Sequence, residues 1–286
     1  MKYLDPVSLA RLRNLELELR RSTAWAPSPG RHSSASRGLS HDFAQHRAYA
    51  PGDELKALDW KVYARKDRFF VKEYNEERMA TAHILADASG SMAFGAKWEL
   101  GCRLAMAMAY LVIARGDAAG LMTFDTAPRE GVPPRSSMSQ LETLDGLLER
   151  AAPGGETDLG SVLDKAAGQL KRRSVVVLVS DLLGEGKGVM AALKSLKARR
   201  HEVMVLQVLD PRERTLDFDG PVVFESLEDR STLAVDADAV REEYVREFER
   251  SARLYEAAFR GSEISYGVFA TDGRWDLALG RFLTLP

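Results

Sequence analysis

The stretch AHILADASGSMAFG, residues 82–95, decides the fold of this chain. Its first five residues are mainly apolar, which is typical of a strand that helices cover on both faces. The run ends at Asp87, and Ser89 and Ser91 follow with Gly90 between them, whose backbone is free to turn tightly. A carboxylate and two hydroxyls that leave a strand end together can point into one small cup. Such hard oxygen donors suit Mg²⁺.

The same pattern is also typical of a plain helix N-cap, because Ser and Asp satisfy the free N–H groups of a helix start. Two later stretches favour a site. GGETDL, residues 154–159, offers a hydroxyl and a carboxylate ahead of a helix, and SVVVLVSDLL, residues 174–183, is a second buried strand that ends in an acid. Ligands of open parallel sheets gather outside the carboxyl ends of the strands. The predicted site therefore consists of Asp87, Ser89, Ser91, Thr157 and Asp181.

The composition limits the class of protein. The chain has 286 residues, enough for one large α/β domain and a smaller accessory region, and its formal net charge of −2 gives no general attraction to nucleic acid. The single cysteine, Cys102, excludes an internal disulfide and fits a reducing compartment. The longest apolar run, residues 104–114, is too short to cross a bilayer, and the N-terminus lacks a signal peptide's apolar core. We therefore expect a cytoplasmic protein without a membrane span.

Strand and helix patterns alternate through the larger part of the chain, which predicts an α/β fold with a doubly wound, mostly parallel sheet and helices on both faces. We expect an N-terminal helix and a Ser/Pro/Arg-rich linker over residues 1–40, a β-rich accessory segment over 41–78 and the α/β domain over 79–286. Within that domain we expect strands at 117–125, 174–181, 202–209 and 263–270, a loop at 128–137, edge strands at 222–224 and 233–235, and helices at 97–115, 139–150, 157–172, 187–200, 237–261 and 275–282.

The accessory segment mixes basic and aromatic residues. Val62, Tyr63 and Phe70 favour strands, and residues 66–68 read as the tip of a hairpin. The basic side chains between Arg47 and Lys72 could contact the phosphates and bases of a nucleic acid. They could equally pair with the acids of the same segment, Asp53, Asp59, Glu73 and Glu76. We favour this structural reading, because acids nearly match bases there.

Two sets of motifs resemble known families. Asp87-x-Ser89-x-Ser91, followed by Thr157 and Asp181, resembles the metal-ion-dependent adhesion site (MIDAS) of von Willebrand factor A domains. The preceding segment resembles the signature of the bacterial DUF58 family, whose members carry it directly ahead of a von Willebrand-type domain. This signature is RAYAPGD at 47–53, LDW at 58–60, YAR at 63–65, VKEY at 71–74 and EER at 76–78.

The resemblance implies a metal-dependent protein-binding adaptor. Ser89, Ser91 and Thr157 would bind Mg²⁺, or Mn²⁺ or Ca²⁺ in its place, and Asp87 and Asp181 would bind it directly or through water. Asp158 would orient a ligand or a water. A carboxylate of a protein partner would take the remaining position. Glu156 departs from the most common spacing and could occupy that position itself. Family members are commonly encoded beside MoxR-type AAA+ ATPases, which implies such an ATPase as partner in the maturation or assembly of client proteins.

A hydrolase is the main alternative. A strand-end Asp with Mg²⁺ also resembles haloacid-dehalogenase-type phosphatases, but the acid/base carboxylate that these carry two residues later is Ser89 here. The predicted cup holds no histidine, and the chain has no phosphate-binding Gly-x-x-x-x-Gly-Lys-Ser/Thr loop. We therefore expect a binding protein and not an enzyme.

Overall fold

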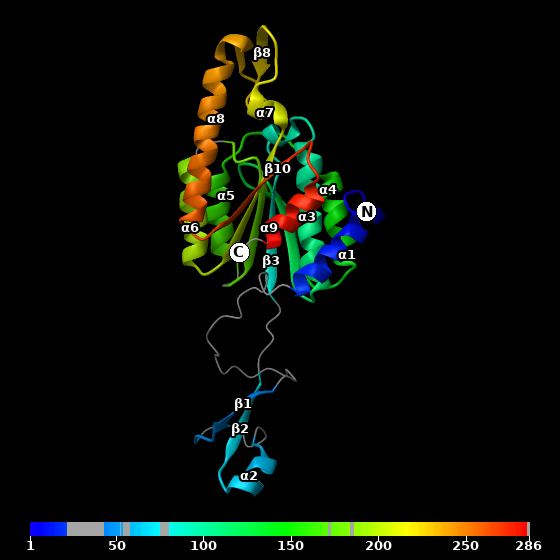
Figure 1. Cartoon of the computed structure of the whole chain (residues 1–286), viewed down its shortest axis with the longest axis vertical. Helices are drawn as coiled ribbons and strands as arrows, with labels where there is room; N and C mark the ends of the chain where they lie inside the picture. The colour runs from blue at the N-terminus through cyan, green and yellow to red at the C-terminus, as the bar shows by residue number, and fades with distance from the viewer. Residues whose placement is uncertain are drawn as a thin grey trace. The chain divides into compact units, whose positions relative to one another are not determined.

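The computed structural model describes residues 1–21, 43–51, 53, 58–74, 80–170, 173–183 and 186–284. The chain forms two compact units. The larger unit combines Met1–Pro27 with Ala80–Pro286, and the smaller unit is Ser28–Met79. Figure 1 shows the elements of both units.

A six-stranded sheet organises the larger unit, with strand order β10-β7-β6-β3-β4-β5. Five strands run parallel, and only the edge strand β5 is antiparallel to its neighbour. This arrangement confirms the predicted mostly parallel α/β sheet. The strands are β3 (Thr81–Asp87), β4 (Ala118–Phe124), β5 (Pro128–Arg135), β6 (Val175–Ser180), β7 (Glu202–Leu209) and β10 (Ser265–Ala270).

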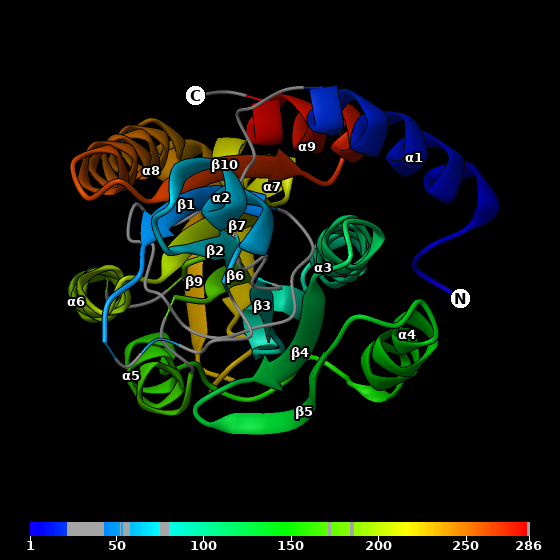
Figure 2. The same cartoon turned by 90° about the horizontal axis from the view of Figure 1, so that it is seen from below.

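Helices cover both faces of this sheet, as Figure 2 shows. One face packs against α1 (Pro6–Arg21), α3 (Lys97–Ala114), α4 (Gln140–Arg150) and α9 (Trp275–Thr284). The other face packs against α5 (Leu159–Gln169), α6 (Gly186–Ala198) and α8 (Ala237–Arg260). Because both faces are covered, the central strands are almost wholly apolar, and all six residues of β6 are buried. Two separate hydrophobic cores result.

The N-terminal helix α1 is part of the larger unit. Leu12 and Leu15 of α1 are buried in the same core as α3 and α9. The Asp145 carboxylate accepts hydrogen bonds from the backbone N–H groups of Lys2 and Tyr3, at 2.6 and 3.0 Å. The chain start is thereby fixed to α4.

The topology reverses beside the central strand β3. From β3 the chain continues to β4 on one side, whereas β6, the next parallel strand, pairs with the other side of β3. The carboxyl ends of β3 and β6 therefore flank the switch point, which is where ligands of open α/β sheets bind. Asp87 is the last residue of β3, and Asp181 directly follows β6.

The loop predicted at residues 128–137 was wrong, because the structure has strand β5 there. Three prolines in PREGVPPR argue against a central strand, but prolines are compatible with an edge strand whose N–H groups have no ladder to join. β5 pairs only with β4 and carries register shifts. Sequence reasoning missed it because its residues lack the apolar alternation of a half-buried strand.

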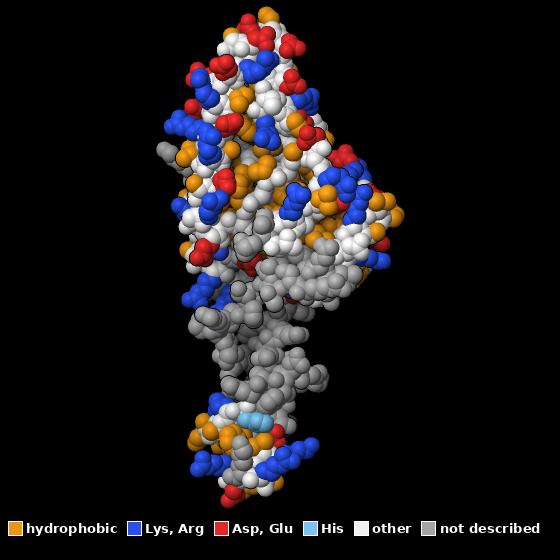
Figure 3. All heavy atoms as spheres, viewed as in Figure 1, with side chains coloured by type: hydrophobic (Ala, Val, Ile, Leu, Met, Phe, Trp, Pro, Cys, Tyr) orange, Lys and Arg blue, Asp and Glu red, His pale blue; other side chains and the backbone are white. Residues whose placement is uncertain are grey.

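The segments predicted as edge strands form a separate hairpin. β8 (Pro221–Glu225) and β9 (Thr232–Asp236) pair antiparallel with each other and not with the six-stranded sheet. The short helix α7 (Pro211–Thr215) leads from β7 towards this hairpin, and the 24-residue helix α8 follows it (Figure 1). Basic and acidic side chains intersperse over this part of the surface (Figure 3), and α8 carries ion pairs one turn apart, such as Arg260 with Glu256 at 2.7 Å.

The smaller unit contains β1 (Phe43–Ala48), α2 (Trp60–Lys66) and β2 (Phe70–Tyr74). β1 and β2 pair antiparallel. The hairpin tip predicted at 66–68 was wrong, since residues 60–66 are helical. The Asp59 carboxylate caps this helix by accepting from the N–H groups of Lys61 and Val62, and Asp67 ends it in the left-handed conformation.

The acids of the smaller unit pair with its bases, as the structural reading expected. Asp53 pairs with Arg47 at 2.9 Å, and Asp59 contacts His46 at 2.9 Å. The expected pairing of Glu73 and Glu76 lies outside the side chains that the structure describes. Across the described part of both units, we find no helix with the length and apolar character of a membrane span.

Candidate functional site

Asp87 is a buried carboxylate at the switch point. It is 1% exposed, and its carboxylate accepts hydrogen bonds from the Ser89 N–H at 2.9 Å and from the Ser180 hydroxyl at 2.6 Å. Burial, together with repulsion from the Asp181 carboxylate, raises the pKa of Asp87 to about 6. Two acids at the ends of neighbouring strands therefore act on each other electrostatically.

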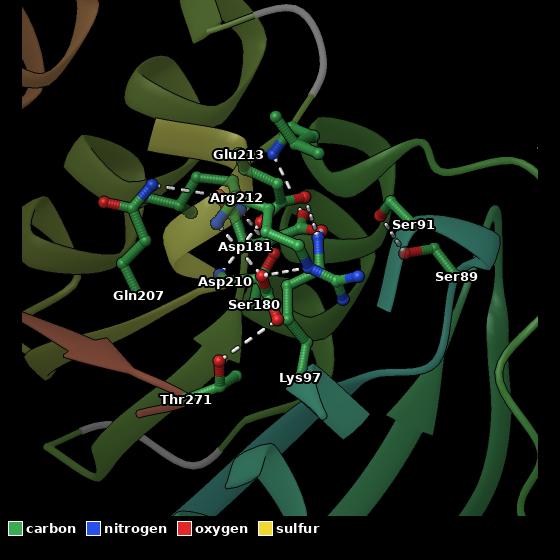
Figure 4. A network of polar contacts seen from close by, with 12 residues as sticks. Ser89, Ser91, Lys97, Ser180, Asp181, Gln207, Asp210, Arg212, Glu213 and Thr271 are labelled. Carbon is green, nitrogen blue, oxygen red and sulfur yellow. Dashed lines mark hydrogen bonds and ion pairs between the residues drawn. The ribbon is translucent and has the colours of Figure 1, made fainter. Parts of the chain in front are cut away.

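Ser89 and Ser91 leave the end of β3 side by side. Ser89 precedes a single 3₁₀ turn, Gly90–Ala93, and this turn brings the two hydroxyl oxygens to 3.1 Å (Figure 4). Ser89 is fully buried, and Ser91 is partly exposed. The serine pair therefore presents two neutral oxygen donors at the edge of the Asp87 pocket.

The loop that carries Thr157 is fixed to the serine turn by two backbone hydrogen bonds. The Gly90 N–H donates to the Gly155 carbonyl at 2.8 Å, and the Gly154 N–H donates to the Ala88 carbonyl at 2.9 Å. Thr157 Oγ1 is buried, and among the described residues no group forms a hydrogen bond with it. A buried hydroxyl without a partner is costly, and a water or an ion commonly explains one.

The acids flanking Thr157 have other positions than the resemblance implied. The Asp158 carboxylate accepts from the Ser161 N–H at 2.9 Å and so caps α5. Glu156 is exposed to solvent. The predicted helix start at 157 thus moves to Leu159, with Asp158 as its N-cap.

Asp181 faces an internal cation. The ammonium group of Lys97, at the start of α3, lies 2.8 Å from the Asp181 carboxylate and 2.5 Å from the Glu213 carboxylate of α7 (Figure 4). Lys97 is 0% exposed and Asp181 is 1% exposed. The second oxygen of Asp181 accepts from the Leu183 N–H at 3.1 Å. Asp181 is therefore engaged on both oxygens.

Sequence reasoning missed Lys97. A lysine at the first position of a helix is ordinarily solvated, so nothing in the local pattern indicates burial. Its partner Glu213 is 116 residues away in the chain and is held by the Asp210 capping box of α7, where the two side chains cap each other's backbone. Only the folded chain shows that α7 closes over the strand ends and shields this lysine from solvent.

A second residue that the sequence did not indicate is Glu228, in the turn between β8 and β9. Its carboxylate interacts electrostatically with the Ser91 hydroxyl, with the N–H and hydroxyl of Thr157 and with Asp181, although Thr157 Oγ1 has no hydrogen-bond partner among the described residues. Burial and the Asp181 charge raise the pKa of Glu228, while the contacts with Ser91 and Thr157 oppose that rise. Because the turn is a surface connection, no strand-end pattern marks this residue.

The donor set is consistent with a hard cation. Asp87, the two serines, Thr157 and Glu228 offer carboxylate and hydroxyl oxygens, which suit Mg²⁺, Mn²⁺ or Ca²⁺ better than soft metals. Within the described ranges, no three Asp, Glu, His or Cys side chains are arranged to bind one metal ion. Any such cation would thus depend on the hydroxyls, and the unpartnered Thr157 oxygen is the observation that fits it.

Fold and site together define a class, namely a mixed α/β domain whose polar donors gather at the switch point of a mostly parallel sheet. Within that class, the chain belongs to the family described as protein of unknown function DUF58, whose profile matches residues 45–253. Membership of this family was predicted from the motifs and is confirmed.

Relatives match the whole chain or parts of it. Protein Rv1480 of Mycobacterium tuberculosis is 28% identical over 98% of this chain and 90% of its own length. Protein MAV169 of Mycobacterium avium is 30% identical over 53% of this chain and 91% of its own length. Protein YeaD of Bacillus subtilis is 35% identical, over 27% of this chain and 19% of its own length.

The chain is similar to solved structures only at low sequence identity. BatB from Bacteroides thetaiotaomicron is 14% identical with a TM-score of 0.46, covering 72% of this chain and 97% of its own. An aerotolerance-related membrane protein from Bacteroides fragilis is 19% identical with a TM-score of 0.43, covering 70% of this chain and 94% of its own. Because such neighbours are described as membrane proteins, the cytoplasmic location expected from the sequence is corrected and not retained.

Proposed function

We propose that the larger unit is a von Willebrand A-type protein-binding module with an adhesion site for a divalent cation. Ser89, Ser91 and Thr157 would hold the cation as hydroxyl ligands, and Asp87 would balance its charge directly or through water. Asp181 would contact the cation through a water molecule, or would attract it only by its negative charge, because Lys97 already binds one of the Asp181 oxygens. The cation would supply an electrophilic position for a partner's carboxylate.

The observation that carries this proposal is the buried Thr157 hydroxyl without a partner, on a loop hydrogen-bonded to the serine turn. The serine turn does not cap a helix, since Ser89 makes no side-chain cap hydrogen bond and the N-cap of α3 is Ala96, and a cap would have no use for a second hydroxyl from another loop. A hard cation needs both, since three neutral oxygens leave its charge available to an incoming acid.

The partner follows from family resemblance. We propose that a MoxR-type AAA+ ATPase presents the acidic side chain, and that the two proteins act together in the maturation or assembly of clients. In this proposal the chain is an adaptor and performs no catalysis.

The cation is tested by calorimetric titration of the full chain with Mn²⁺ and Mg²⁺ after treatment with EDTA. We expect one binding site, which Thr157→Val abolishes. Thr232→Val, which removes an exposed hydroxyl on β9, is the control and should bind as the wild type does. Equal binding by both variants would overturn the proposal.

The adaptor function is tested by co-purification with the ATPase, with and without EDTA and with Ser89→Ala. A complex that survives both treatments would refute a metal bridge. The hydrolase alternative is tested on the same samples with p-nitrophenyl phosphate and Mg²⁺, where turnover that Asp87→Asn abolishes would refute a role in binding alone.

A further inference from the structure

The turn between β8 and β9 is a rigid structure. The Ser226 N–H donates to the Ser231 carbonyl at 2.8 Å, and the Arg230 N–H returns to the Ser226 carbonyl at 3.1 Å. The Ser226 hydroxyl accepts from the N–H groups of Glu228 and Asp229, each at 3.3 Å. The Asp229 carboxylate accepts from the Ser231 N–H and hydroxyl at 3.1 and 2.7 Å. Residues 226–231 therefore hold Glu228 in a defined direction.

This turn packs directly on the serine turn. A Cβ atom on Gly90 would lie 2.2 Å from the Leu227 carbonyl oxygen and 2.7 Å from its carbon. Real side chains do not tolerate such distances from backbone atoms, so only glycine permits this approach. The turn itself does not require glycine, because the φ of Gly90 is not positive, and Gly90 is needed instead to admit the neighbouring turn of the hairpin.

The approach places an acid against the donors of the proposed site. Glu228 is half-buried, with Ser91 and Thr157 close to its carboxylate and Asp181 near enough to act on its charge. Although Lys97 pairs with Asp181, the Asp181 charge still disfavours a second carboxylate nearby. The hydrogen-bonded turn and the Gly90 contact nevertheless direct it there.

We propose that Glu228 is an internal carboxylate that closes the site, standing at Ser91 and Thr157 where a partner's Asp or Glu would bind. This inference rests on the proposed function and names how it is regulated. The β8–β9 hairpin has to lift its turn from Gly90 before a partner can engage the cation. Glu228, and not Glu156, is then the acid that fills the open position.

The test uses Mn²⁺ alone as probe, with the full chain after EDTA treatment. Glu228→Gln removes the charge and keeps the shape, and Glu225→Gln removes an exposed charge from the same hairpin as control. Mn²⁺ affinity and the water-proton relaxivity of the bound ion are measured for both variants. The relaxivity reports how many waters the ion carries.

We expect Glu228→Gln to raise the relaxivity of bound Mn²⁺, as water replaces the carboxylate, and to weaken Mn²⁺ binding by about tenfold. Added acetate should then lower the relaxivity of the variant more than that of the wild type. Glu225→Gln should match the wild type in all three measurements. If Glu228→Gln binds Mn²⁺ as tightly as the wild type does and with the same relaxivity, this inference is overturned and the proposed function stays intact. Absence of Mn²⁺ binding by the wild type would overturn both.

A second measurement needs no variant. If Glu228 contacts the cation, the metal-free and the Mg²⁺-loaded wild type should differ in amide hydrogen exchange at residues 226–231. We expect slower exchange in the loaded form. Identical exchange in the two forms, in protein that calorimetry shows to be loaded, would contradict an internal carboxylate.

Discussion

Replacing Lys97 by methionine should be the most destabilising single change at the strand ends. The ammonium group has no exposure to solvent and forms ion pairs with Asp181 at 2.8 Å and Glu213 at 2.5 Å. Methionine fills the volume of the lysine stem but leaves two carboxylates without their cation. Asp181 is 1% exposed, so water cannot replace the lost partner without opening the structure.

The magnitude follows from the burial of this ion pair. Removing one member of a buried ion pair costs about 3–5 kcal/mol, because the other charge remains buried and unpaired. An exposed pair one helical turn apart contributes only about 0.3–0.5 kcal/mol. The same helix provides such a control, since Arg103 contacts Glu99 at 2.7 Å and their side chains are 36% and 58% exposed.

The assay is urea unfolding of the full chain at pH 7.5 in EDTA. We expect Lys97→Met to lose about 3–5 kcal/mol of unfolding free energy, and Arg103→Met to lose under about 0.5 kcal/mol. The double variant Lys97→Met/Asp181→Leu should recover part of the loss, because it removes the more deeply buried of the two stranded charges and leaves Glu213. A loss in Lys97→Met no larger than that in Arg103→Met would refute the reasoning.

Three further changes test the site. Burial raises the pKa of Asp87 from 3.8 to about 6. The folded protein therefore loses stability as the pH rises from about 3.8 to about 6 and Asp87 ionises, and nothing is lost below that range. Asp87→Asn in EDTA should therefore gain about 3 kcal/mol in urea unfolding at pH 7.5 and nothing at pH 3.5, and an equal gain at both values would contradict the shift. Thr157→Val in EDTA should match or exceed wild-type stability by about 1 kcal/mol in the same assay, because it removes an unpartnered hydroxyl; a clear loss would mean that the hydroxyl has a partner. Gly90→Ala should displace the Leu227 backbone and speed hydrogen exchange at residues 226–231, whereas wild-type exchange rates would show that the turn does not rest on Gly90.

The sequence was sufficient for the frame of the fold. Buried parallel strands need apolar residues at nearly every position. The two strands that lead to Asp87 and Asp181 could therefore be predicted from their local sequence alone. Because ligands of open parallel sheets gather outside the carboxyl ends of the strands, both acids could then be placed at one edge of the sheet. The Thr157 loop followed from its glycines and its position before a helix.

Contacts between residues that are far apart in the chain could not be predicted from the sequence. Lys97 is buried by Glu213, and Glu228 reaches the site from a turn more than 130 residues after Ser91. Their local sequences favour solvent exposure, and tertiary packing overrides that preference. The helix over residues 60–66 was missed for a related reason, since β-favouring Val62 and Tyr63 follow an Asp59 cap that outweighs their propensity.

Strand β5 limits how this protein can meet another chain. Three of its eight residues are prolines, which carry no amide hydrogen to offer an incoming strand. Growth of the sheet by addition of a foreign strand at this border is therefore discouraged, whether the strand comes from a specific ligand or from another copy during aggregation. Another protein is therefore expected to bind at the loops at the ends of the strands and not along the edge strand β5.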